Sequence, residues 1–475
     1  MYSGTDQSPA AYHRPNVFIT DSQEENLTAQ RRRHDFIVAL SIALLAGTAS
    51  LYAGPAENPG KNPEEPIALS ARSAILIDEA TGRVLYQRNP DQSLVPASLA
   101  KLMTLHIVLQ KLEDRSIDRS DVVSLSVNAW ADHQAPGSTL MHLGPGQIVT
   151  VEELMKGMVI ASGNDAATAL AEYVAGSTQE FVRMMNEEAK FMGFSTMHFT
   201  DPAGVRPDNM VTAREFAQFC RRYIELHPES LAELHSLREF VYPLAQNAPG
   251  ARLAPIKIRT QYNGNYLVWD GIGVDGLKTG HLDEENFTAA ITAMRGTTRL
   301  IAVLLGVPGA TLSDGARSRT DDELALLSYG FRTYATLSID PPPLAPVRVW
   351  KGVTRQLAIM SAPHVQLTVR EDERAQLAYS VLLQTPLVAP IMKGQKVGDI
   401  LYTAGSEEVG RIPLVAVADV PAAGFLRRAF DGISLGLAAF GADTRNTFNM
   451  ALDTIRPGTV ASAEARNKSE GGPQE

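Results

Sequence analysis

Residues 95–104 read VPASLAKLMT, a short polar turn that leads into an apolar helical pattern. Leucines recur at helical spacing as far as residue 112, and Pro96 suits a first turn, so a helix is predicted from about residue 96 to residue 112. Ser98 and Lys101 are three residues apart, which puts the hydroxyl and the amine on one face of this helix. A neutral lysine could deprotonate the serine there, and the helix N-terminus would favour the developing alkoxide. Taken alone, a capping or solvated serine is the simpler interpretation.

A second polar segment lies in residues 159–167, VIASGNDAA, inside a helical pattern that covers roughly residues 151 to 174. Ser162, Gly163 and Asn164 are either the cap of a helix or a polar loop that points into a cleft. When this segment is considered by itself, the capping interpretation is again the simpler one.

A third motif lies in residues 274–281, VDGLKTGH, just before an alternating strand pattern. Lys278 and the Thr279 hydroxyl at a strand edge can hold a carboxylate, and Gly280 lets the backbone approach a substrate closely. The alternative is a plain turn. Residues 271–276 also match G-x-G-x-x-G, but no long helix pattern follows and no β-α-β unit surrounds them, so a dinucleotide site is rejected.

The three motifs together change the interpretation of each one. Ser-x-x-Lys, a Ser-x-Asn element and Lys-Thr-Gly occur in the order found in penicillin-binding proteins and class A β-lactamases. The flanking residues closely resemble the low-molecular-mass penicillin-binding proteins, the D-alanyl-D-alanine carboxypeptidases, whose middle motif is Ser-Gly-Asn. The resemblance covers about residues 67–420, because residues 390–398, PIMKGQKVG, and 413–416, PLVA, look like the C-terminal β domain of that family.

The resemblance implies an α/β fold. Its first part would be a β-lactamase or transpeptidase-like core, an antiparallel sheet with flanking helices and a helical subdomain, and a small all-β domain would follow. Periodicity alone predicts a hairpin at 75–78 and 82–86, helices at 178–192, 213–226 and 320–334, strands at 287–295 and 300–307, and later strands at 347–350, 365–370, 378–383, 400–403 and 411–417.

The resemblance also implies a mechanism. Ser98 would attack the carbonyl between the two terminal D-alanines of a peptidoglycan stem peptide, and water would resolve the acyl-enzyme. Lys101 would be the base, with its pKa lowered by burial and by the positive charge of Lys278. Ser162 would relay the proton to the leaving amine, and Asn164 would bind the substrate amide. β-Lactam antibiotics would acylate the same serine.

Further residues would bind the substrate. Lys278 and Thr279 would hold the terminal carboxylate, and the backbone N–H groups of the nucleophile and His281 would form the oxyanion hole. A carboxylate-binding arginine is expected on the helix after the last core strand. Counting along the chain places it at Arg319, with Arg317 as a rival because the preceding loop is unexpectedly long.

Composition limits the other functions. With 475 residues, 44% of them hydrophobic, the chain can bury a large core and is too long for one ordinary domain. A net charge of −10 provides no cationic field for nucleic acid. The single cysteine, Cys220, allows no intrachain disulfide and is expected in a helix core. The histidines show no metal-ligand spacing, so neither a metal nor another cofactor is predicted.

The N-terminal region, residues 1–66, contains an export segment. Residues 31–46, RRRHDFIVALSIALLA, combine a basic flank with an apolar core of signal-peptide length. Cleavage after Ala49 is favoured, although the apolar run to Ala53 is just long enough to remain as an anchor. Residues 54–66 are rich in Pro, Gly and Glu and predict a linker. The expected location is the periplasmic face of the bacterial inner membrane.

The C-terminal part begins after residues 341–346, PPPLAP, which separate a catalytic domain, 67–340, from the β domain, 347–420. Residues 424–440 carry an apolar face and predict a helix on the membrane surface, although packing against the β domain is an alternative. Residues 456–475 are polar and predicted to be disordered.

Three other functions remain open. A D,D-endopeptidase could use the same core, but the β domain and terminal helix favour the carboxypeptidase. A class A β-lactamase has no use for the β domain, and no convincing glutamate is found for its deacylating water. A catalytically idle, membrane-attached peptidoglycan binder would not need the intact motif set.

Overall fold

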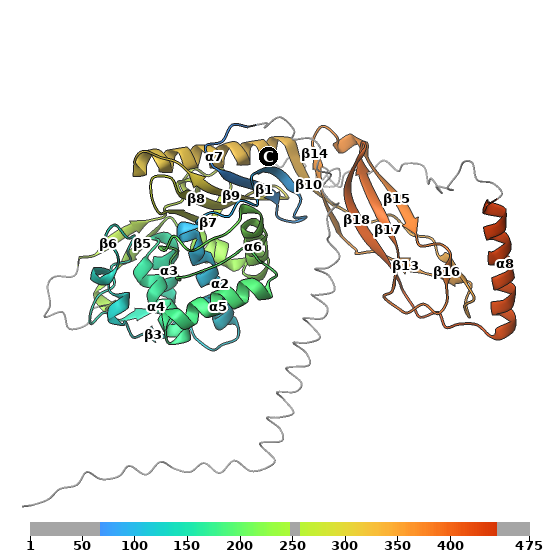
Figure 1. Ribbon diagram of the computed structural model, residues 1–475, viewed down its shortest axis with the longest axis horizontal. Helices are drawn as coiled ribbons and strands as arrows, with labels where there is room; N and C mark the ends of the chain where they lie inside the picture. The colour runs from blue at the N-terminus through green and yellow to red at the C-terminus, as the bar shows by residue number, and fades with distance from the viewer. Residues whose placement is uncertain (1–66, 248–256, 444–475) are drawn as a thin grey trace, which may run out of the picture. The chain divides into compact units, whose positions relative to one another are not determined.

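The structure, a computed structural model, describes residues 67–247 and 257–443 (Figure 1). Within these residues the first domain is built on a five-stranded antiparallel sheet with the order β2-β1-β9-β8-β7. Its strands are β1 (Ser73–Asp78), β2 (Val84–Arg88), β7 (Val274–His281), β8 (Phe287–Arg295) and β9 (Thr298–Val307). β1 and β9 are buried on both faces, as their continuous apolar runs require. β7 is the last strand, so one of its edges has no partner strand among the described residues.

Helices cover both faces of this sheet (Figure 1). α7 (Leu312–Thr333) packs on one face, and α2 (Ala100–Glu113) and α6 (Ala213–Leu226) belong to the core on the other face. The helical subdomain adds α3 (Val151–Ile160), α4 (Asn164–Ala175) and α5 (Thr178–Phe191). The first ten residues of α2 are all buried, because the helix is apolar around most of its circumference. This part of the predicted architecture is confirmed.

Two predicted helix boundaries were wrong for local reasons. The pattern over 151–174 is two helices, because the chain turns at residues 161–163 between α3 and α4. α7 starts at Leu312 rather than near residue 320, because Thr311 caps it by accepting a hydrogen bond from the Asp314 amide. Gly315 then lets the helix pass Phe287, since a Cβ at this position would lie 2.1 Å from the phenyl ring.

The second domain contains only strands and short turns between residues 334 and 420. β10 (Tyr334–Ile339) follows α7 directly and pairs with β14 (Val365–Arg370), so this domain's pairing begins before the proline-rich segment. Two further sheets have the orders β12-β11-β16 and β13-β18-β17-β15. Their strands are β11 (Val347–Trp350), β12 (Gln356–Leu357), β13 (Ile359–Met360), β15 (Leu377–Leu383), β16 (Leu387–Val388), β17 (Lys396–Ala404) and β18 (Glu407–Ala416).

The last described element is α8 (Phe425–Asp443). None of the described helices has the length and apolar character needed to cross a bilayer. The predicted export segment, the linker at 54–66 and the tail at 456–475 lie outside the described residues.

Candidate active site

Ser98 lies in a single helical turn, η1 (Ala97–Leu99), that leads directly into α2. Two glycines allow other segments to approach this turn. A Cβ on Gly204 would lie 1.8 Å from the Ala97 carbonyl oxygen, and a Cβ on Gly280 of β7 would lie 2.7 Å from the Ser98 backbone nitrogen. Ala97 itself has a left-handed φ of 48°. The serine is therefore held between a loop and the Lys-Thr-Gly strand by contacts that tolerate no added side chain.

Lys101 is the most closely surrounded charged group at the site. Its Nζ atom lies 3.0 Å from Ser98 Oγ. The same nitrogen lies 2.7 Å from Asn164 Oδ1 and 2.7 Å from the Ala203 carbonyl oxygen. The two latter oxygens can only accept hydrogen bonds, whereas the serine hydroxyl can also donate one. A neutral amine has two N–H bonds and one lone pair, so it matches this set by donating twice and accepting the serine proton.

The pKa of Lys101 agrees with this arrangement. Burial lowers it from 10.5 to about 7, and the carboxylates of Asp201 and Asp165 oppose the shift only in part. Desolvation, the first of the two expected causes, produces this lowering. Lys101 can therefore be neutral in a substantial fraction of the molecules near pH 7.

The Ser-Gly-Asn turn joins α3 to α4 and reaches Lys101 through Asn164. Ser162 has a left-handed φ of 56°, and its carbonyl oxygen accepts a hydrogen bond from the Thr139 hydroxyl at 2.7 Å. The Ser162 hydroxyl has no hydrogen-bond partner among residues 67–247 and 257–443, which leaves it available to a substrate. The structure thus assembles the first two motifs around one lysine.

Two buried aspartates that the sequence analysis did not single out shape the loops around this lysine. Asp201 accepts hydrogen bonds from the amides of residues 203 to 206 and from Asn209, and this turn directs the Ala203 carbonyl at Lys101. Asp165 accepts from three successive amides, residues 141 to 143. The Asp-Pro-Ala-Gly sequence at 201–204 is a turn signal, but it does not reveal which carbonyl faces the site.

The Lys-Thr-Gly strand brings a second buried lysine to the site. Lys278 Nζ donates to the Thr279 carbonyl oxygen at 2.8 Å. Burial lowers the pKa of Lys278 well below 10.5, and the charges of Lys101 and Arg319 lower it further. An incoming carboxylate would reverse these effects, because it adds a negative charge beside the ammonium. Lys278 and Arg319 therefore form a candidate anion site close to Lys101.

Arg319, not its rival Arg317, faces this anion site. Arg319 is 5% exposed on α7, whereas Arg317 points to solvent. The Arg319 Nη2 atom donates to the Gly264 carbonyl oxygen at 3.3 Å. Gly264 in turn lies close to the Lys-Thr-Gly strand, because a Cβ at this position would be 3.2 Å from Thr279 Oγ1. The Arg319 Nε atom lies 3.1 Å from Glu323 in an ion pair whose angle does not make a hydrogen bond. Burial raises the pKa of Glu323 to about 7, so this partner neutralises the arginine only in part.

Replacing Arg319 by alanine is expected to lower kcat/KM for a peptide with a free C-terminal carboxylate about 10- to 100-fold, because one charge-assisted contact is lost. Most of the loss should appear as a raised KM, since the carboxylate is bound before and during the reaction. Arg317→Ala is the matched control from the same helix and should change neither parameter. Equal effects of the two substitutions would contradict the assignment.

A buried histidine, His235, supports β7 from behind, and the sequence did not predict it. His235 Nδ1 lies 2.9 Å from the Leu277 carbonyl oxygen, and its Nε2 lies 2.8 Å from the Tyr223 hydroxyl. Burial lowers the pKa of His235 to about 4, so the ring is neutral near pH 7. Because a carbonyl can only accept, the proton lies on Nδ1 and the tyrosine donates to Nε2. The ring holds the peptide unit that precedes Lys278.

Two more sequence predictions concern side chains near the site. His281 ends β7 and stacks on Phe287 with a ring separation of 5.4 Å, which places its backbone beside the Gly280 approach to Ser98. Cys220 lies in α6 and is fully buried, and burial raises the pKa of its thiol. Its prediction as a core residue is confirmed.

Comparison with known proteins gives a consistent result. The family described as D-alanyl-D-alanine carboxypeptidase matches residues 60–309, and the family described as penicillin-binding protein 5, C-terminal domain, matches residues 336–422. The chain is 34% identical to D-alanyl-D-alanine carboxypeptidase DacC of Escherichia coli strain K12 over 400 residues, which cover 82% of this chain and 95% of that protein.

Two further relatives extend the comparison. D-alanyl-D-alanine carboxypeptidase DacF of Bacillus subtilis strain 168 is 31% identical over 391 residues, which cover 82% of this chain and 94% of the relative. Penicillin-binding protein 5 from Haemophilus influenzae has a similar solved structure, with a TM-score of 0.67 and 28% sequence identity. That match covers 76% of this chain and 100% of the solved one.

Proposed function

The chain belongs to the D-alanyl-D-alanine carboxypeptidase family of low-molecular-mass penicillin-binding proteins and is a serine-type carboxypeptidase, and on that premise we propose that Ser98 is its nucleophile. The observation that carries the assignment is the set of three oxygens around Lys101 Nζ. Two of them can only accept hydrogen bonds, and the third belongs to the hydroxyl that must lose a proton. The same geometry supports Lys101 as the base.

The reaction then follows two balanced steps. Ser98 Oγ attacks the carbonyl carbon of the penultimate D-alanine while its proton moves to Lys101 Nζ. The C–N bond breaks when the proton held by Lys101 passes through the Ser162 hydroxyl to the leaving amine, and free D-alanine departs. Water then attacks the ester carbonyl, one of its protons passes to Ser98 Oγ as the ester C–O bond breaks, and the shortened peptide leaves with a C-terminal carboxylate. The backbone amides of Ser98 and His281 stabilise the oxyanion in both steps.

Substrate binding uses the remaining groups. Asn164 binds the substrate amide and also orients Lys101. Lys278, Thr279 and Arg319 bind the terminal carboxylate, which supports a preference for chain ends. Gly280 keeps β7 against the serine. β-Lactams carry a carboxylate and a reactive carbonyl, and we propose that they acylate Ser98 in the same orientation.

The carboxypeptidase is distinguished from an endopeptidase by its products. Incubation with a stem pentapeptide is expected to release free D-alanine, while a crosslinked stem-peptide dimer should be cut at a much lower rate. Amino-acid analysis of D-alanine and chromatography of the dimer measure the two activities on one enzyme preparation. Faster cleavage of the dimer would instead make this chain an endopeptidase.

The chain is also proposed to be exported and to act at the periplasmic face of the inner membrane. The predicted export segment supports this location, and so does the arrangement of α8. Arg427 Nη1 donates to the Val353 carbonyl oxygen at 2.9 Å, and Asp431 accepts from the Lys351 amide at 2.6 Å. The polar face of α8 therefore packs on the β domain. Four of its apolar residues are more than 60% exposed: Phe425, Leu426, Phe430 and Ile433.

This orientation predicts the outcome of a vesicle flotation experiment. Phe430→Asp should reduce binding to phospholipid vesicles about 10-fold or more, because a buried phenyl ring contributes about 2 kcal/mol and a charge replaces it. Ser361→Asp adds the same charge at a partly exposed site of the β domain outside α8 and should bind nearly as well as the unmodified chain. Equal losses would mean that net charge, rather than the apolar face, controls the association.

A further inference from the structure

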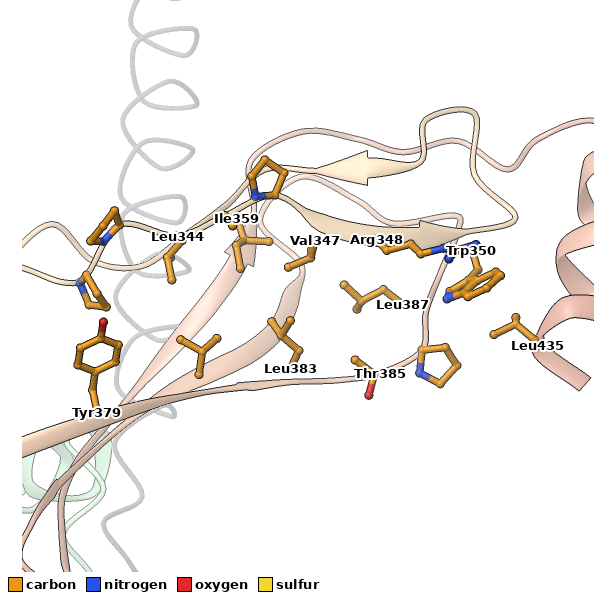
Figure 2. Close-up of a pocket in the computed structure, with 16 residues that line it drawn as sticks. Leu344, Val347, Arg348, Trp350, Ile359, Tyr379, Leu383, Thr385, Leu387 and Leu435 are labelled. Atoms are coloured by element: carbon orange, nitrogen blue, oxygen red, sulfur yellow. The ribbon is translucent and has the colours of Figure 1, made fainter. Parts of the chain in front are cut away.

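The C-terminal β domain contains an apolar groove with a volume of about 700 Å³, which takes no part in the chemistry at Ser98 (Figure 2). We call it the β-domain groove. Its walls come from β15, from the proline-rich segment 342–346, from β11 and from α8. The residues that matter for the argument are Val347, Arg348, Trp350, Val381, Leu387 and Leu435.

The groove exists because one edge of the sandwich is not closed by a strand. β15 is the outer strand of its sheet, and its only strand partner among the described residues is β17. The chain that runs past it contains Pro342, Pro343 and Pro346, which have no N–H to donate to a neighbouring strand. Tyr379, Val381 and Leu383 alternate along β15 toward the groove and stay only half-buried. These three side chains, which are mostly apolar, therefore remain partly exposed to solvent.

The groove is elongated and differs at its two ends. Figure 2 shows Tyr379 at one end and Leu435 of α8 at the other, with Leu383 and Leu387 between them. Near the α8 end the guanidinium of Arg348 lies 3.6 Å from the centre of the Trp350 ring.

The α8 end of the groove also carries a cationic side chain. Arg348 lines the groove and forms no ion pair with a carboxylate of the described residues, whereas the carboxylate of Asp431 accepts from the Lys351 amide at 2.6 Å. An apolar channel with one unpaired guanidinium at one end matches a molecule that has one long apolar chain and one anionic head. A guanidinium stacked on an indole still offers its N–H groups to a phosphate.

From this geometry we propose that the β-domain groove binds one acyl chain of an anionic phospholipid, with its phosphate beside Arg348. The volume lies within the range of about 300 to 1,000 Å³ typical of small-ligand sites. The source of the lipid is the bilayer around α8, because Leu435 lines the groove while Leu426 and Phe430 of the same helix are exposed. The source of the lipid rests on the proposed membrane association, but the binding of a lipid in the groove does not.

The test uses the full chain and lysophosphatidylglycerol, a single-chain anionic lipid, below its micelle-forming concentration. Native mass spectrometry and calorimetry should show saturable binding of one lipid per chain. Val381→Trp fills the groove and should weaken binding at least about tenfold, since loss of two buried methylene contacts already has that effect. Leu382→Trp, on the neighbouring residue that is 37% exposed, is the matched control and should bind like the unmodified chain.

The head group is tested separately. Arg348→Gln should weaken binding of lysophosphatidylglycerol several-fold and leave the weaker binding of lysophosphatidylcholine unchanged. If both lipids bind the unmodified chain equally, the anionic part of the proposal is wrong. Binding that does not saturate, or that is the same in Val381→Trp and Leu382→Trp, would overturn the acyl-chain site.

A second measurement does not require the Val381→Trp protein to fold. A lysophosphatidylglycerol with bromine atoms on its acyl chain should quench the fluorescence of Trp350, and Trp350→Phe should remove that quenching while Trp130 and Trp269 remain bright. Absence of quenching contradicts the site. Phe430→Asp separates this inference from membrane attachment, because it should lose vesicle flotation and still bind the soluble lipid. If the Phe430→Asp protein binds vesicles as well as the unmodified chain does, the proposal of attachment through α8 is wrong. The acyl-chain site is then tested by the binding of the soluble lipid alone.

Discussion

Ser98→Ala is expected to reduce kcat/KM for D-alanine release by about 10⁶-fold and to abolish covalent labelling by penicillin. The expected size follows from nucleophile removal in other serine hydrolases, where the remaining rate comes from oxyanion stabilisation and substrate binding. The hydroxyl has one close partner, Lys101 Nζ at 3.0 Å, so its removal should leave the fold intact. The melting temperature should therefore stay close to that of the unmodified chain.

The control for this experiment is another serine. Ser361→Ala removes an exposed hydroxyl in the β domain and should leave labelling and D-alanine release unchanged. A Ser98→Ala protein that still forms a stable penicillin adduct would show that another residue is acylated. Digestion of labelled protein and identification of the modified peptide would then find that residue.

The second large effect is expected at Lys101. Its pKa of about 7 means that most of the side chains are protonated at pH 6, and an ammonium cannot accept the serine proton. The rate of acylation by penicillin should therefore rise with pH, about tenfold per unit well below 7, and level off above it. Penicillin is the right probe, because its acylation step requires neither a deacylating water nor D-alanine release.

Two substitutions test whether Lys101 is the titrating group. Lys101→Ala should reduce the plateau rate by about 10² to 10⁴-fold, the usual contribution of a general base. Lys101→Arg should be similarly inactive, because a guanidinium stays charged at every relevant pH. His281→Asn is the control, since burial and neighbouring positive charges lower the pKa of His281 and its loss should not move an inflection near 7. A profile without that inflection in the unmodified enzyme would reject the assignment.

The sequence contained the chemical groups of the site but not the contacts that position them. Ser98, Asn164 and Lys278 belong to motifs whose order identifies them, and the structure brings them together around Lys101. The Ala203 carbonyl could not be predicted, because every residue has such a group and only the fold of the Asp201 turn selects one. The neutral His235 behind β7 was missed because spacing rules search for metal ligands rather than buried supports.

The same distinction between features that the sequence predicts and contacts that it does not applies to the fold. Strands and helices with strong periodicity were predicted correctly, whereas boundaries set by a single contact were not. The beginning of α7 depends on the Thr311 cap and on the missing side chain of Gly315 against Phe287. The pairing of β10 with β14 joins residues on either side of a proline-rich segment, and neither strand reveals its partner locally.

The contact at Gly280 limits how this enzyme could evolve resistance to antibiotics. Added bulk beside a nucleophile is a common way to keep an inhibitor out of a pocket. At position 280, however, the first added carbon would lie 2.7 Å from the Ser98 amide nitrogen and 2.9 Å from the Thr288 hydroxyl, so it would meet the enzyme's own backbone before any drug. Escape by substitution at this position would displace the nucleophile, so selection would have to act on other residues.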